Sequence, residues 1–199
     1  LELARRFGVS QGTVRKAIEA LAAENLLVRR QGKGTFVASH GESRAQFRFL
    51  RLRPDAGPAI QPVSRILACR RVRAPGDVGR VLRLQGPEWV LYIRRLLIFG
   101  AAPIVLDDIW LAGDEFRGLT GERLAGHSSP LYSVFESELG TKMIHAQEKL
   151  RAVVASESQA ALLEIGPGTP LLLVERVTST FKGRPVELRR GLCRTDSHH

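Results

Sequence analysis

Apolar residues recur with the period of a helix along the first part of the chain. Residues 1–7 place their apolar side chains on one helical face, and Gly8 is typical of the residue that ends such a helix. Ser10 suits the N-cap of a second helix, which Asn25 would terminate. The apolar stripe of this second helix consists of Val14, Ala17, Ile18 and Leu21.

A short hairpin is predicted directly after the second helix. Residues 26–30 and 35–38 read as two strands, and the turn Gln31-Gly32-Lys33-Gly34 joins them. The two glycines of this turn permit the positive φ angles that a tight connection needs. Two helices followed by a Gly-rich basic hairpin are typical of a winged helix-turn-helix.

The rest of the chain alternates strand patterns with a few short helices. A strand after each turn signal, mostly in hairpin order, indicates an α+β fold with an antiparallel sheet. The predicted strands are 47–53, 63–72, 88–99, 104–111, 142–155, 171–181 and 184–194. The predicted helices are 76–84, 129–139 behind Pro130, and 156–163 with Ser156 and Gln159 as a capping box.

The polar, small-residue stretch between these two patterns divides the chain. We expect a winged helix-turn-helix domain over 1–38, a linker over 39–50 and a second domain over 51–199. The first domain is expected to be incomplete at its N-terminus, because the chain starts at Leu1 inside a helix and without a Met.

The net charge of +10 is concentrated in the first domain. Residues 1–53 hold 11 Lys and Arg against 4 Asp and Glu, whereas the remaining residues hold 19 against 16. Phosphate backbones attract such a segment through the release of counterions. Charge alone leaves a solubilising surface as the alternative.

Cysteine count and hydropathy exclude several classes of protein. The two cysteines, Cys69 and Cys193, lie far apart in sequence, so neither a disulfide framework nor a Cys-based zinc site is expected. His127 is isolated in a predicted loop, and we expect no metal and no cofactor. The chain has no 18-residue apolar run and no signal-peptide pattern, so a cytoplasmic protein without a membrane partner is expected.

The second helix and the hairpin carry the residues expected to contact DNA. A recognition helix presents its first turn to base edges in the major groove, where Arg pairs with guanine and Gln with adenine. Thr and Lys suit phosphate oxygens, and a basic turn with glycines can reach the backbone or the minor groove. The candidate DNA-binding residues are Ser10, Gln11, Gly12, Thr13, Arg15, Lys16, Arg30, Gly32, Lys33 and Gly34.

The segment LELARRFGVSQGTVRKAIEALAAENLLVRRQGKGTFV closely resembles the DNA-binding domain of the GntR family of bacterial transcription regulators. The family pattern is a helix ending in "FGVS", then "TVR" and a hairpin that closes on "GTFV". The chain departs from it at Gln11, where many members have Arg, and at Asn25, where Gly is usual. The family's first helix would precede Leu1.

Residues 51–199 resemble the UTRA domain of the HutC-type branch of that family. The motifs that match include Arg94-Arg95, Pro103-Ile104, Ser129-Pro-Leu-Tyr132 and Gly183-Arg-Pro-Val-Glu187. The chain departs from the branch where it has SPLY instead of "SLY", and TDSHH instead of a terminal "DRY". The resemblance implies a chorismate-lyase-like antiparallel sheet, a bound small metabolite and a homodimer in which the ligand changes the pose of the DNA-binding heads.

A pocket for an anionic metabolite needs Arg and hydroxyl donors that converge, and carboxylates for the ligand's amine or hydroxyl groups. Arg94 and Arg95 are adjacent on a strand, so one faces inward and the other outward. Each candidate has a structural alternative, such as an ion pair across the hairpin or a place in the core. The candidate effector-binding residues are Arg65, Arg94, Asp108, Ser128, Ser129, Tyr132, Glu187 and Arg189.

Three functions are compatible with this sequence. The first is an effector-responsive regulator, most simply a repressor, that binds a double-stranded DNA operator. The second is a lyase-like enzyme fused to a DNA-binding head, although no nucleophile–base motif, phosphate loop or metal-ligand spacing is present. The third is a winged-helix module that contacts protein instead of DNA.

Overall fold

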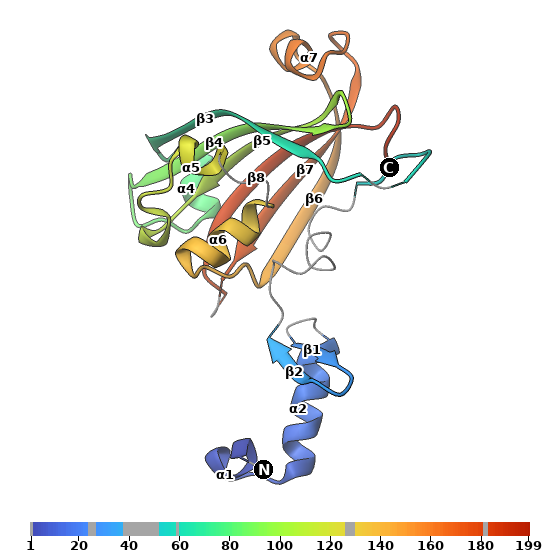
Figure 1. Ribbon diagram of the computed structural model, residues 1–199. Helices are drawn as coiled ribbons and strands as arrows, with labels where there is room; N and C mark the ends of the chain where they lie inside the picture. Colours follow the sequence, from blue (N-terminus) through green and yellow to red (C-terminus); the bar gives the residue numbers. More distant parts are fainter. Residues whose placement is uncertain (1, 24–26, 38–51, 59, 126–129, 181–182) are drawn as a thin grey trace.

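The computed structural model describes residues 2–23, 27–37, 52–58, 60–125, 130–180 and 183–199. The described elements form a small helical unit with a hairpin and a larger unit built on one sheet (Figure 1). The predicted linker 39–50 and residues 47–51 of a predicted strand lie outside the described residues.

The first helix ends and the second begins where their capping residues predict, whereas Asn25, the predicted end of the second helix, lies outside the described residues. α1 (Glu2–Phe7) ends at Gly8, whose φ of 63° allows a hydrogen bond back to the preceding turn. α2 (Gln11–Ala23) begins after Ser10, whose hydroxyl accepts a 3.1 Å hydrogen bond from the backbone N–H of Thr13. The connection between the helices is therefore a glycine stop at Gly8, one residue, and a serine cap at Ser10.

The hairpin that follows is a two-stranded antiparallel sheet. β1 (Leu27–Arg30) and β2 (Gly34–Val37) pair in register, with Arg30 opposite Gly34. Gly32 and Gly34 have φ angles of 72° and 107°, which few other residues adopt at low cost. The predicted wing is thus present as a hairpin with a glycine-dependent turn.

The second unit contains a six-stranded antiparallel sheet in the order β3-β4-β5-β8-β7-β6. The β4–β5 and β7–β8 pairs are hairpins, and the β5–β8 pairing joins the first three strands to the last three. β3 and β6 are consequently the two edge strands. The strands are β3 (Val63–Arg73), β4 (Trp89–Phe99), β5 (Ala102–Leu111), β6 (His145–Val154), β7 (Pro170–Ser179) and β8 (Pro185–Arg194).

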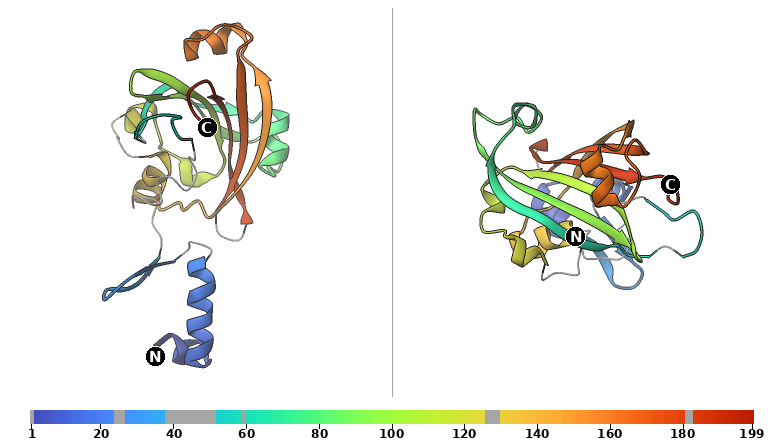
Figure 2. Two further views of the ribbon diagram at one scale, coloured as in Figure 1. Left: turned by 90° about the vertical axis from the view of Figure 1, so that its right-hand side faces the viewer. Right: turned by 90° about the horizontal axis from the view of Figure 1, so that it is seen from above.

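Short helices cover both faces of this sheet. On the face that we call the α6 face, α5 (Gly121–Ala125), α6 (Leu131–Leu139) and the 3-10 turn η1 (Asp114–Phe116) pack on one apolar cluster. On the opposite face, called the α4 face, α4 (Gly76–Val81) and α7 (Glu157–Leu163) pack on two others. Figure 2 shows α4 on the side of the sheet opposite α5 and α6.

Because both faces of the central strands are covered, β4, β5 and β8 bury both odd- and even-numbered side chains. Ile93 and Ile109 lie in the cluster under α6, whereas Leu96 and Leu106 lie in the cluster under α7. The edge strand β6 is different, since nearly all of its side chains are exposed.

The predicted α+β class with an antiparallel sheet is confirmed, and most predicted elements are present. The predicted strand 47–53 was wrong over its two described residues, because Leu52 and Arg53 are not in the sheet. Arg53 instead exchanges backbone hydrogen bonds with His199. The short helix α5 and the turn η1 were not predicted. The capping box at α7 is present, with Ser156 and Gln159 bonded to each other's backbone.

Phe135 offers a test of this packing. It is fully buried in α6 and stacks edge-on against Phe116 at 5.2 Å between ring centroids. Phe135→Ala leaves a cavity, so we expect it to lower the free energy of unfolding by about 3–5 kcal/mol. Denaturant unfolding measures the change, and Ser156→Ala, which removes only a cap, should cost about 1 kcal/mol. Equal losses for the two variants would contradict the assigned core position.

Candidate functional site

The predicted DNA-contacting residues lie on the exposed surface of α2 and at the turn of the β1–β2 hairpin. Gln11, Arg15 and Lys16 are exposed on the first turns of α2, and Lys33 is exposed at the tip of the hairpin. Arg30 is the last residue of β1, and its side chain lies outside the described part of the chain. Ser10 and Thr13 bond to each other through their hydroxyls, so both serve the helix start.

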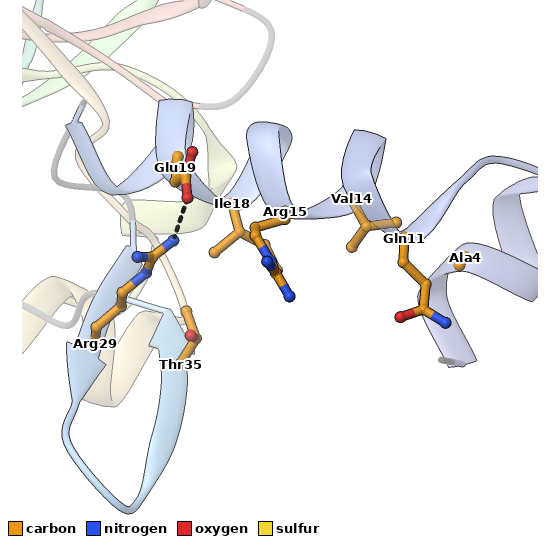
Figure 3. A pocket seen from close by; sticks show the side chains of 8 residues that line it. All are labelled: Ala4, Gln11, Val14, Arg15, Ile18, Glu19, Arg29 and Thr35. Carbon is orange, nitrogen blue, oxygen red and sulfur yellow. Dashed lines mark ion pairs between the residues drawn. The ribbon is translucent and has the colours of Figure 1, made fainter.

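A groove of about 300 Å³ separates α2 from the hairpin. Figure 3 shows Gln11 and Arg15 projecting from α2 into this groove beside Val14 and Ile18. One wall is the hairpin, from which Arg29 reaches Glu19 of α2 at 3.6 Å. The complete lining is Ala4, Gln11, Val14, Arg15, Ile18, Glu19, Arg29 and Thr35. The groove therefore places the side chains of Gln11 and Arg15 next to the hairpin.

A second group of polar residues is buried on the α6 face of the sheet. Arg95 of β4 and Asp107 of β5 are cross-strand partners, and both Nε and Nη2 of Arg95 lie 2.9 Å from Oδ2 of Asp107. Arg189 of β8 approaches the same oxygen at 3.6 Å with Nη1. One carboxylate thus holds two guanidinium groups in the interior.

Glu187 continues this network toward α6. Its Oε1 accepts hydrogen bonds from Nε and Nη2 of Arg189 at 2.9 and 2.6 Å. Its Oε2 accepts a hydrogen bond from the hydroxyl of Tyr132, which also lies 3.1 Å from the hydroxyl of Thr178. The guanidinium of Arg189 sits 5.1 Å from the centre of the Tyr132 ring. Glu187 is fully buried, so these partners replace water around its carboxylate.

Arg176 and Glu148 extend the network to the edge of the sheet. Arg176 lies opposite Arg189 across β7 and β8, and its Nε donates to Glu148 Oε1 of β6 at 2.7 Å. We call the group Arg95, Asp107, Tyr132, Glu148, Arg176, Thr178, Glu187 and Arg189 the α6-face cluster.

Burial and neighbouring charges shift the pKa values of the cluster members in opposite directions. Burial lowers the pKa of Arg95, despite the opposing charge of Asp107. Burial also disfavours the charged form of Arg189, but the adjacent carboxylates outweigh it, Glu187 above all, and raise its pKa. Burial, followed by the charge of Glu187, raises the pKa of Tyr132 to about 12. Tyr132 therefore stays a neutral donor at physiological pH.

A glycine in β8 makes room for the central carboxylate. A Cβ placed on Gly191 would lie 2.8 Å from Oδ1 of Asp107, closer than side chains normally pack. Gly191 is also the cross-strand partner of Asp107 and of Val174. Asp107 can therefore lie against the β8 backbone only because this position has no side chain.

The predicted effector-binding residues are divided between the two faces of the sheet. Tyr132, Glu187 and Arg189 belong to the α6-face cluster, whereas Arg94 and Asp108 lie on the α4 face. There, Nε of Arg94 lies 2.9 Å from Oδ1 of Asp108, which also accepts a hydrogen bond from Tyr92. Arg65 is exposed on the edge strand β3, and Ser128 and Ser129 lie outside the described residues.

Sequence reasoning missed Arg95, Asp107, Arg176 and Glu148. The sequence did contain a signal for two of them, namely the adjacent pairs Arg94-Arg95 and Asp107-Asp108. In each pair, one side chain must lie on each face of the sheet. The side that would hold the cluster depends on which helix covers which face, and strand alternation contains no such information. Among the described residues, no group of His, Cys, Asp and Glu could hold a metal ion.

Comparison with known proteins identifies both units. Residues 1–37 match the model of bacterial regulatory proteins of the gntR family, and residues 59–199 match the UTRA domain. The chain is 52% identical to the ligand-binding domain of a GntR-family transcriptional regulator from Bordetella bronchiseptica. That structure superposes with a TM-score of 0.73, covering 76% of this chain and 94% of the other.

Two curated relatives match nearly the whole chain. The HTH-type transcriptional regulator Rv0792c of Mycobacterium tuberculosis is 31% identical over 94% of this chain and 69% of its own length. The probable fructoselysine utilization operon transcriptional repressor of Escherichia coli is 26% identical over 98% of this chain and 79% of its own length.

Together these matches define a DNA-binding transcription regulator. The chain belongs to the GntR family of bacterial transcription regulators and carries a UTRA domain, which confirms the resemblance to the HutC-type branch. No helix in the described residues is long and apolar enough to span a membrane.

The two tyrosines of the chain give a test of the hydrogen bonds that join Tyr92 to Asp108 and Tyr132 to Glu187. Burial, then its hydrogen bond to Asp108, raises the pKa of Tyr92 to about 12, the value reached by Tyr132. Folding favours the protonated phenols, so their contribution to stability is present below pH 10 and is lost as the pH rises from about 10 to about 12. Phenolate absorbance should therefore rise near pH 10 in denaturant but near pH 12 in the folded protein.

Tyr132→Phe separates the two groups, because only the Tyr92 transition then remains. A folded protein whose phenolate absorbance rises fully near pH 10 would contradict the hydrogen bonds of both hydroxyls to carboxylates.

Proposed function

We propose that this protein is an effector-responsive repressor that binds a double-stranded operator as a homodimer in the cytoplasm. Residues 1–38 form its DNA-binding domain, 39–50 a linker and 51–199 its effector-binding domain. A small metabolite bound at the α6-face cluster changes the affinity for the operator. The observation that carries the effector half of this proposal is the buried cluster of Arg, Glu and Tyr on the α6 face.

The N-terminal unit supports the DNA half. Gln11 and Arg15 share one groove, and Lys16 and Lys33 are exposed on α2 and on the hairpin. Arg and Gln read guanine and adenine by paired hydrogen bonds, whereas lysines neutralise phosphates. Residues 1–37 hold seven Lys and Arg against three Glu, so the unit attracts a polyanion.

The charge balance of the α6-face cluster indicates the class of effector. Its formal charges cancel, because the three guanidinium groups face three carboxylates. An anionic group of a ligand must therefore replace a carboxylate as the partner of one arginine. The carboxylate that loses this arginine then needs a new hydrogen-bond donor. A small anionic metabolite that also carries hydroxyl or amine groups supplies both: the anion for Arg189 or Arg95, and the donor for Glu187.

A packed route leads from this cluster toward the linker. Leu52, the first described residue after the linker, packs on an apolar group that contains Leu97, Val105 and Cys193. Leu97 and Val105 are two residues along their strands from Arg95 and Asp107. A ligand that moves those two side chains therefore acts on strands that pack against Leu52, two residues after the predicted linker. This supports a coupling free energy between the two binding sites.

Arg15→Ala tests the DNA half. We expect it to weaken operator binding by about 1–3 kcal/mol and to relax the preference at one base pair, because a base contact is lost. Lys33→Ala is the matched phosphate variant, and it should weaken binding to all sequences and reduce the salt dependence. Fluorescence anisotropy with operator and scrambled duplexes at several salt concentrations measures both effects. An unchanged base preference in Arg15→Ala would contradict its role.

Glu187→Gln tests the effector half. A thermal-shift screen of hydroxylated and amino-substituted carboxylates and of sugar phosphates should find compounds that raise the melting temperature of the wild-type protein. Glu187→Gln keeps the shape but removes the charge, so the same compounds should shift its melting temperature less. Lys142→Gln also removes one charge, but at a half-buried lysine that pairs with Glu136 outside the cluster, so it should respond like wild type. Equal shifts in all three proteins would place the effector elsewhere, and catalytic turnover of a hit would favour the enzyme hypothesis.

A further inference from the structure

The positive charge of the second domain is concentrated in one short segment. Residues 63–84 hold six Arg against one Asp, whereas residues 85–199 hold 13 Lys and Arg against 14 Asp and Glu. This segment contains the edge strand β3 and the helix α4 that follows it (Figure 1). All six arginines are exposed, and we call them the β3–α4 arginine surface: Arg65, Arg70, Arg71, Arg73, Arg80 and Arg83.

Carboxylates of the protein do not neutralise this surface. Among the described residues, no ion pair involves any of its six arginines. Asp77, the acidic residue of the segment, pairs instead with Arg190 of β8 at 2.8 Å. The carboxylate of Glu88, at the start of the next strand, accepts a 2.7 Å hydrogen bond from the backbone N–H of Gln85. The guanidinium charges therefore face solvent, where only mobile ions balance them.

Two of the arginines are positioned by partners that carry no charge. The guanidinium of Arg73 lies 4.8 Å from the centre of the Trp89 ring and donates a hydrogen bond to the carbonyl of Pro87. The guanidinium of Arg70 lies 5.9 Å from the centre of the Tyr92 ring. An aromatic ring or a carbonyl orients a guanidinium without cancelling its charge. These side chains are thus partly ordered before any anion binds them.

The register of β3 distributes the guanidinium groups over both faces of the sheet edge. Arg71 pairs with Leu91 and lies on the α6 face, whereas Arg70 pairs with Tyr92 and lies on the α4 face. Within the described chain, no strand pairs with the outer side of β3. Groups on opposite faces of an edge strand cannot converge on one small ligand, but they can contact successive phosphates of a polymer. The arrangement therefore suits a polyanion.

The polyanion that this protein brings close to itself is the DNA bound by its N-terminal unit. The predicted linker of 12 residues spans at most about 43 Å. One turn of duplex measures about 34–36 Å, so DNA beside the operator lies within the reach of this linker. Tethering raises the effective concentration of the flanking DNA to about the millimolar range. Backbone contacts that are too weak to act alone then add to the affinity.

We propose that the β3–α4 arginine surface is a second DNA contact, which binds the phosphate backbone of the duplex beside the operator. This inference goes beyond the proposed function, and it rests on DNA binding by the N-terminal unit and not on any effector. Arginine pairs with phosphate through two parallel hydrogen bonds, and such backbone contacts add affinity without reading bases. The N-terminal unit supplies the specificity, and the arginine surface supplies additional affinity that depends on salt.

Duplex length separates the two DNA contacts in the whole chain. An operator is first selected from a random duplex library with the wild-type protein, and is then prepared without flanks and with about 20 base pairs on each side. Fluorescence anisotropy should show that the wild type binds the flanked duplex at least about tenfold more tightly. Equal affinity for the two duplexes overturns the second contact alone. Failure to bind either duplex contradicts both this contact and the DNA half of the proposed function.

Arg71→Gln with Arg83→Gln tests the surface itself. We expect this variant to bind the unflanked duplex like wild type and to lose most of the gain from the flanks. On the flanked duplex, the slope of log affinity against log salt concentration should become less steep by about 2, since each phosphate contact contributes about 0.9. A variant that keeps the full gain from the flanks and the wild-type slope overturns the assignment.

Two further variants separate charge from folding. Arg53→Gln with Lys149→Gln also removes two exposed positive charges, but outside the arginine surface, so the gain from the flanks should equal that of wild type. Arg71→Lys with Arg83→Lys keeps the charges and should retain most of the gain. An equal loss in the control variant indicates an effect of net charge and overturns the local contact. Thermal melts of all variants verify that they are folded.

Discussion

The buried carboxylate of Asp107 is the interaction on which the organisation of the effector domain depends. It holds the guanidinium of Arg95 and approaches that of Arg189, and it fits against β8 only because Gly191 has no side chain. Burying a charge is costly unless a partner and hydrogen bonds compensate it, and removal of one partner leaves the other unpaired. The cluster therefore behaves as a unit: its members are stable inside the sheet together, and the loss of one of them leaves its partners uncompensated.

This unit lies between two apolar regions of the same face. The cluster under α6 packs beside Tyr132, and the group containing Leu52, Leu97 and Cys193 packs on the other side. Close-packed interiors transmit small displacements instead of absorbing them. The charged cluster thus lies between the apolar core under α6 and the group that packs against Leu52, and Glu148 extends it to the edge strand β6.

The sequence predicted the two units unequally well. In the N-terminal unit, a glycine stop, a serine cap and a glycine-dependent turn each act within a few residues, so the helices and the hairpin could be placed directly. The capping box at α7 was predictable for the same reason. In the larger unit, strands were found by alternation and turn signals, but the short helix α5 was missed because its five residues have too little periodicity to detect.

By itself, the sequence determined the family, the helices and hairpin of the N-terminal unit and the alternation of each strand, because these depend on local spacing. Only the tertiary structure decided that β5 pairs with β8, which brings Asp107 next to Arg189 across about eighty residues of chain. It also decided that Arg95 and not Arg94 faces the cluster. Alternation places neighbouring side chains on opposite sides of the sheet, but the helices packed on each side determine which side holds the buried cluster.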